Sequence, residues 1–194
     1  MTSHTLTSII PMNANDFFKI AESESFDQFQ VPYFNLKSHR LIEQTENDTH
    51  IIRKIEIKPK SGAPKILTKF LGNEDLRYID TQVIIKSKRE LHFKTNAPLL
   101  TDHIHVDGIV KIEELDADTC LRVMKVNFKF TGPLYFFSKV IESHILSELK
   151  QTIEIYPKVV ADYKVHIGYR PKSNLKNSVS DTPSLKKSGV LLMI

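Results

Sequence analysis

The longest regular pattern of hydrophobic positions runs from Thr131 to Tyr163. Apolar or aromatic residues recur there every three or four positions, at Leu134, Phe137, Ile141, Ile145, Leu149, Ile153, Tyr156, Val160 and Tyr163. This spacing places them on one stripe of an α-helix, which at 1.5 Å per residue would be roughly 45 Å long. Gly132 and Pro133 indicate its start, because proline at the first helical position gives up no hydrogen bond. We expect Pro157 to kink the helix or to end its regular part.

Hydrophobic and polar residues alternate with a period of two between residues 35 and 130, which predicts antiparallel strands joined by hairpins. The predicted hairpins pair residues 35–45 with 49–58, 75–86 with 89–96, and 103–115 with 119–130. A first strand is expected at His4–Ile10, followed by two short helices between Asn13 and Pro32. Residues 66–72 fit a further short helix that ends at Gly72.

The last predicted strand shows what the sheet must do. Its apolar residues Cys120, Met124, Val126, Phe128 and Phe130 share one face, and Lys125, Asn127 and Lys129 share the other. A sheet with one apolar face and a helix with one apolar stripe bury both by packing together. The predicted fold class is therefore α+β: a curved antiparallel sheet of six or seven strands wrapped around the long C-terminal helix, with two short helices after the first strand.

Composition agrees with one globular domain. The chain has 194 residues, of which 41% are hydrophobic and 26% charged. Residues 1–168 are expected to form the domain and residues 169–194 a basic, disordered tail. The net charge of +4 lies in that tail, since five Lys or Arg residues and one Asp follow Val165. The balanced charge of the rest gives no reason to expect a nucleic-acid partner.

The sequence contains no secretory signal, no transit peptide and no apolar run long enough to span a membrane. Its one cysteine, Cys120, excludes an intramolecular disulfide. These features together predict a cytoplasmic protein.

The order of predicted elements resembles the START-like superfamily, whose fold is called the helix-grip and whose members include proteins of the birch-pollen-allergen type. The stretch from Gly62 through Tyr78 to the helix led by Gly132 is similar to PRELI and VASt lipid-transfer domains. The resemblance implies a cavity between the sheet and the C-terminal helix that holds a lipid or another apolar molecule. It requires no catalytic residue and no cofactor. By analogy with PRELI proteins, it also admits the mitochondrial intermembrane space as a location.

The inward-facing side chains are the candidate ligand contacts, although the same residues would equally fill a solid core. They are Tyr78, Phe93, Arg122, Met124, Phe128 and Phe130 on strands, and Phe137, Ile141, His144 and Ile145 on the helix.

Arg122 falls on the apolar face of its strand, where a buried guanidinium needs a partner such as a phosphate or carboxylate headgroup. A β-bulge near residues 121–124, or a side chain that reaches out to solvent, would remove that need. His144 is either a ligand contact or a histidine satisfied within the interface.

The loop at residues 58–72 combines basic and apolar residues and has two interpretations. It would either contact an anionic membrane transiently through Lys65, Ile66, Lys69 and Phe70, or pack against the edge of the sheet.

Signatures of catalysis and metal binding are weak. His103 and His105 would share a face of a strand, but no third ligand lies nearby in the sequence. No catalytic motif or glycine-rich phosphate loop occurs. A cyclase or aromatase on the same fold would need several polar groups in the cavity, and Arg122, Tyr78 and His144 are the ones that we expect there. The preferred interpretation is a binding and transfer protein for an apolar ligand, and the alternatives are such an enzyme or a protein-interaction module with a filled core.

Overall fold

The computed structural model describes residues 1–60 and 76–170. The predicted helix at residues 66–72 and the predicted membrane contacts at Lys65, Ile66, Lys69 and Phe70 lie outside the described residues, as do residues 171–194 of the predicted tail. No helix in the two described stretches is both long and apolar enough to cross a membrane.

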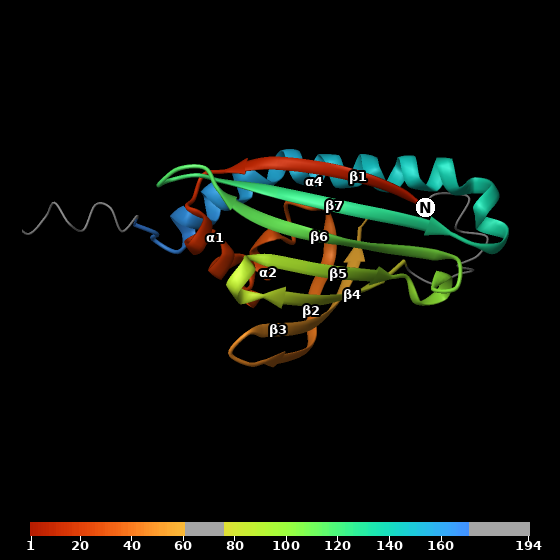
Figure 1. The fold of residues 1–194 in the computed structure, drawn as a ribbon, viewed down its shortest axis with the longest axis horizontal. Coiled ribbons are helices and arrows are strands. Elements are labelled where there is room, and N and C mark those ends of the chain that lie inside the picture. The colour runs from red at the N-terminus through yellow and green to blue at the C-terminus, as the bar shows by residue number, and fades with distance from the viewer. Residues whose placement is uncertain (61–75, 171–194) are drawn as a thin grey trace, which may run out of the picture.

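Seven antiparallel strands form one curved sheet in the order β1-β7-β6-β5-β4-β3-β2 (Figure 1). The strands are β1 (Thr2–Ile10), β2 (Leu36–Glu46), β3 (His50–Pro59), β4 (Tyr78–Ile85), β5 (Glu90–Asn96), β6 (Ile104–Glu114) and β7 (Cys120–Phe130). All three predicted hairpins are present, and the first strand pairs with the last. The register shifts twice within the β2–β3 pair, whereas β7 pairs with both of its neighbours without a shift.

Two short helices cover one end of the sheet, as the sequence predicts. Helix α1 spans Ala14–Ala21 and helix α2 spans Glu24–Gln30. Each begins at a side-chain cap: Asn13 accepts a hydrogen bond from the backbone N–H of Asp16, and Ser23 accepts one from Phe26. The helical conformation is interrupted between α1 and α2, where Ser23 caps the start of α2.

The long C-terminal helix, α4, spans Ser138–His166 and lies along the sheet behind β1 (Figure 1). Its predicted start at Pro133 is wrong, because Gly132–Phe137 form the 3₁₀-helix η3. Gly132 has a φ of 59°, and the turn that follows buries Leu134 and leaves Phe137 exposed. Pro157 does not end α4, whose last turns are held by buried residues such as Val160 and Tyr163. The predicted fold class is confirmed.

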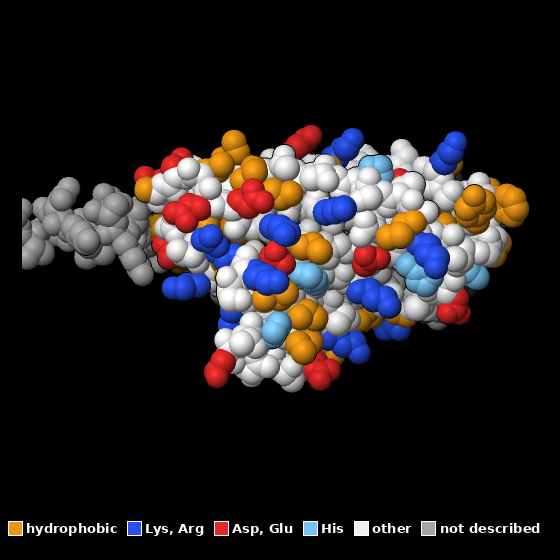
Figure 2. Space-filling model, viewed as in Figure 1, with side chains coloured by type: hydrophobic (Ala, Val, Ile, Leu, Met, Phe, Trp, Pro, Cys, Tyr) orange, Lys and Arg blue, Asp and Glu red, His pale blue; other side chains and the backbone are white. Residues whose placement is uncertain are grey.

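Helix α4 is anchored by a separate core at each end. The larger core joins α1, α2 and the ends of β1 and β7 to Tyr156, Val160 and Tyr163 of α4. The smaller core joins Leu134 and Ile141 to side chains around the 3₁₀-helix η2 (Pro98–Leu100). Figure 2 shows one outer face of the molecule, on which lysine, arginine and acidic side chains are interspersed.

Gly108 on β6 makes room for an aromatic ring on the neighbouring strand. It lies directly opposite Phe93 of β5. A Cβ atom at this position would lie 2.6 Å from Cζ of Phe93 and 2.2 Å from the backbone oxygen of Lys125. No ordinary contact is that short, so a side chain here would displace both strands or the ring.

We therefore expect Gly108→Ala to lower the free energy of unfolding by about 1–3 kcal/mol, the usual cost of overpacking a close-packed region. Urea unfolding monitored by circular dichroism measures this change. Lys94→Ala, at an exposed position of β5, serves as the control and should stay within about 0.5 kcal/mol of the wild type. Equal stability of the Gly108 variant and the control would contradict the close approach.

Candidate functional site: a pocket between the sheet and α4

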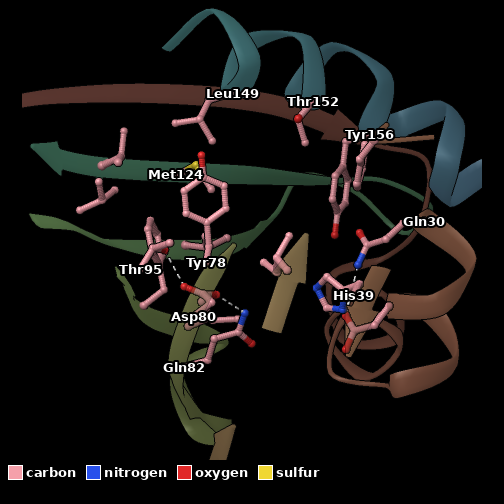
Figure 3. Close-up of a pocket in the computed structure, with 18 of the residues that line it drawn as sticks. Gln30, His39, Tyr78, Asp80, Gln82, Thr95, Met124, Leu149, Thr152 and Tyr156 are labelled. Carbon is pink, nitrogen blue, oxygen red and sulfur yellow. Dashed lines mark hydrogen bonds between the residues drawn. The ribbon is translucent and has the colours of Figure 1, made fainter. Parts of the chain in front are cut away.

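A pocket of about 430 Å³ lies between the inner face of the sheet and α4. It occupies the middle of the helix, between the two anchoring cores. Leu149, Thr152 and Tyr156 project into it from α4, opposite Tyr78 and Met124 of the sheet (Figure 3). His144 and Glu148 also line the pocket but are exposed, so they form part of its rim.

Most of the lining is apolar. The apolar lining residues come from every strand except β1, from α1 and from α4. They include Phe17, Phe18, Phe34, Ile57, Ile84, Leu91, Phe93, Leu100, Ile104, Val106, Val110, Ile112, Met124, Val126, Ile145 and Leu149. An interior of this composition favours the burial of apolar ligand surface.

Polar side chains gather on the part of the wall formed by β4 and β5. Oδ1 of Asp80 accepts a hydrogen bond of 2.6 Å from the hydroxyl of Thr95, and Oδ2 accepts one of 2.7 Å from Nε2 of Gln82 (Figure 3). Asp80 is only 7% exposed. Burial raises the pKa of its carboxyl group above the ordinary value, because the charged form is poorly solvated there.

His39 and Asp27 continue this wall toward α2, and Arg53, which does not line the pocket, pairs with Asp27. Burial lowers the pKa of His39 on β2 to about 4, and the charge of Arg53 adds to the effect, so the imidazole is neutral near pH 7. Arg53 on β3 forms a buried ion pair with Asp27 of α2. Although this pair favours the charged carboxylate, burial outweighs it and raises the pKa of Asp27 to about 6.

Arg122 of β7 lies at the end of the pocket nearest the larger core. The central carbon of its guanidinium is 4.6 Å from the ring centroid of Tyr156 on α4, a cation–π contact. Burial lowers the pKa of Arg122, yet an arginine stays protonated in proteins. A positive charge therefore lies within the pocket wall.

Six of the ten predicted ligand contacts line this pocket, namely Tyr78, Phe93, Arg122, Met124, His144 and Ile145. The other four lie elsewhere. Ile141 belongs to the smaller core, and Phe130 packs against that core. Phe128 stacks on Phe130, with ring centroids 6.4 Å apart, and Phe137 is 40% exposed at the start of α4.

The sequence predicts Arg122, Tyr78 and His144 as the polar residues of the pocket, and the structure adds Asp80, Gln82 and His39. Asp80 and Gln82 follow Tyr78 at a period of two on β4, so their inward orientation was readable once Tyr78 was placed inside. His39 gave no such signal, because the register of β2 shifts beside it.

The structure offers little to support a metal site. Within the described ranges, no three His, Cys, Asp or Glu side chains come together as metal ligands. The His103 ring lies against Gly132, at 3.0 Å from the position that a Cβ there would take.

Glu22, just after α1, lines the pocket, and the stability of the protein depends on whether this residue is protonated. Burial raises the pKa of this carboxyl group from 4.5 to about 7, although Lys86 partly offsets the effect. Its Oε1 is buried without a hydrogen-bond partner. Because the folded protein holds this proton more tightly than the unfolded chain, Glu22 costs stability increasingly as the pH rises from 4.5 to 7.

We expect Glu22→Gln to be more stable than the wild type at pH 8, by roughly 1–2 kcal/mol, and equally stable at pH 4. Chemical unfolding across this pH range measures the difference. The lowered pKa of His39 makes stability rise with pH, but this effect is the same in the wild type and the variant. The difference between the two proteins therefore reports on Glu22. Glu43→Gln, at an exposed position of β2, should show no such pH dependence. A constant difference from pH 4 to pH 8 would contradict the interpretation.

No protein-family model matches the sequence, and no curated protein matches it. Solved structures do match. A protein from Thermus thermophilus superposes with a TM-score of 0.59 at 9% identity, covering 87% of this chain and 100% of that chain. The Zhui aromatase/cyclase from Streptomyces gives a TM-score of 0.58 at 10% identity, with 84% and 95% covered. Norcoclaurine synthase from Thalictrum flavum gives 0.55 at 11% identity, with 87% of each chain covered.

At these identities the matches show the fold alone. The chain has the helix-grip fold, as the sequence predicts. The nearer similarity to PRELI and VASt domains stays a prediction.

Proposed function

We propose that this protein binds an apolar small molecule in the pocket between the sheet and α4. The observation that carries the proposal is the position of the pocket along the helix. Both ends of the α4 stripe are packed into cores, while Leu149 and Thr152 in the middle line the pocket. Burial of a ligand against these side chains would contribute about 25 cal/mol per Å² of apolar surface removed from water.

The finer form of the proposal is a lipid that the protein extracts from one membrane and releases at another. An acyl chain or a ring system would lie along the apolar wall, and polar side chains would set specificity. Exchange of such a ligand requires a path past the rim at His144 and Glu148. Transient contact with an anionic membrane, through the predicted residues Lys65, Ile66, Lys69 and Phe70, belongs to this finer form.

Filling the pocket tests the proposal directly. Thr152 projects into the pocket from α4, so we expect Thr152→Phe to reduce binding of the fluorescent probe 1-anilinonaphthalene-8-sulfonate by at least about tenfold. Gln151→Phe adds the same ring at the neighbouring exposed position and should bind the probe as the wild type does. Fluorescence titration measures both affinities, and native mass spectrometry of the purified protein would reveal a retained ligand. Equal probe binding by the two variants would contradict a ligand site here.

A second candidate is an enzyme of the cyclase type, as the name of one structural match, the Zhui aromatase/cyclase, suggests. The buried carboxyl group of Asp80 favours it, because a raised pKa would suit proton transfer to a carbonyl ligand. This chemistry can be assayed with heptane-2,6-dione, which closes to 3-methylcyclohex-2-enone with loss of one water. An enzyme would accelerate the closure, and Asp80→Asn would abolish the acceleration. A rate equal to that in buffer would contradict cyclase activity toward this diketone.

A further inference from the structure

Arg122 is held on the inner face of the sheet by the pairing of its strand. It lies opposite Ser8 of β1 and opposite Ile112 of β6, and neither pairing is shifted anywhere along β7. A bulge, which could have turned the side chain to the outer face, is therefore absent from β7. The guanidinium lines the pocket instead of reaching the outer surface.

This buried charge has no carboxylate partner among the described residues. Its electrostatic partner there is Tyr156, through the ring contact and the hydroxyl. Nη1 of Arg122 is buried without a hydrogen-bond partner, and so is the hydroxyl of the facing Ser8. Neutral groups thus surround the guanidinium where a negative charge would be expected.

Arg53 is a second buried arginine and provides a comparison, because its charge is paired within the protein. It is 1% exposed and pairs with the carboxylate of Asp27, whose other oxygen accepts a hydrogen bond from Gln30. A buried cation without such a counter-charge costs stability, because desolvation is not repaid by attraction. Arg122 therefore costs stability in the protein alone, and an anion that enters the pocket would offset that cost.

We propose that Arg122 binds the carboxylate of an amphipathic ligand whose apolar part lies along the rest of the pocket. This inference rests on the proposed function and names the class of ligand. The planar guanidinium fork matches the two oxygens of a carboxylate. Tyr156 holds the fork from the helix side, and its hydroxyl points into the pocket (Figure 3). The apolar side chains toward η2 then take the hydrocarbon part.

Among the described residues that line the pocket, Arg122 is the one available cation, and this selects a carboxylate over a phosphate monoester. The other arginine that lines the pocket, Arg89, is already engaged by Asn15 and by the carboxylate of Glu114. A phosphate monoester carries a charge between about −1.5 and −2 near pH 7, which one guanidinium does not neutralise. A carboxylate carries one charge, which Arg122 neutralises alone.

Binding of dodecanoate, dodecanol and dodecyl phosphate, measured by calorimetry, tests the proposal. The two anions are kept below their critical micelle concentrations and dodecanol below its solubility limit. A purely apolar pocket prefers dodecanol, because that ligand loses less hydration. We expect the wild type to prefer dodecanoate, and Arg122→Met to weaken dodecanoate by about ten- to hundredfold while leaving dodecanol unchanged. Arg122→Lys should retain part of the preference. Lys125→Met removes a charge from the exposed outer face of the same strand and should change nothing.

The outcomes separate the two proposals. If no ligand binds, the proposed function itself fails. If dodecanol binds more tightly than dodecanoate and Arg122→Met leaves both affinities unchanged, a ligand pocket remains but the carboxylate site is overturned. If dodecyl phosphate binds most tightly, the choice of carboxylate is overturned in favour of phosphate.

Thermal unfolding of the unliganded protein gives an independent readout. Arg122→Met should unfold at the same temperature as the wild type or a higher one, because it removes an uncompensated charge. Arg53→Met should unfold at a lower temperature, because it leaves Asp27 buried without its partner. Dodecanoate should raise the melting temperature of the wild type more than that of Arg122→Met. An equal loss of stability in the two arginine variants would make Arg122 structural and overturn the proposal.

Discussion

The structure depends on how the apolar stripe of α4 is buried. This 29-residue helix is held at its C-terminal end by aromatic residues of α1 and α2, and at its N-terminal end by the side chains around η2. The curved sheet spans the distance between these two cores. Large side chains fill the space at the ends, whereas Leu149 and Thr152 in the middle face a pocket. The pocket is thus a consequence of where the bulky residues lie along the helix.

The same arrangement forces the protein to accommodate charged groups in its interior, and it does so in three ways. Arg53 and Asp27 neutralise each other across β3 and α2. Asp80 has both carboxyl oxygens hydrogen-bonded by neighbours on its own strand and on β5. Arg122 has only the Tyr156 side chain among the described residues. Because the charge of Arg53 is neutralised and both oxygens of Asp80 are hydrogen-bonded, Arg122 is the group of the three whose counter-charge a ligand would supply.

Periodicity predicted the elements and their order because each depends on local patterning. The strand pairs, the two capped helices and the stripe of α4 all followed from it. The start of α4 did not, because Leu134 and Phe137 fit a helical period as well as the 3₁₀ turn that Gly132 begins. The inward polar residues were missed for two different reasons. Asp80 and Gln82 are polar, so the pattern of hydrophobic positions does not mark them as facing inward. His39 lies on a strand whose shifts in register break the alternation.

The fold is shared with proteins named as enzymes, so the choice between binding and catalysis depends on the pocket itself. A general acid needs a proton that it can deliver to the ligand. Asp80 is poorly placed for this, because Thr95 and Gln82 already donate to both of its oxygens, and transfer would disturb those hydrogen bonds. Arg122 has a buried nitrogen, Nη1, without a hydrogen-bond partner among the described residues, and an anion in the pocket would supply one. Of these two groups, Arg122 is suited to holding a ligand and Asp80 is poorly placed to move a proton, and this comparison favours binding.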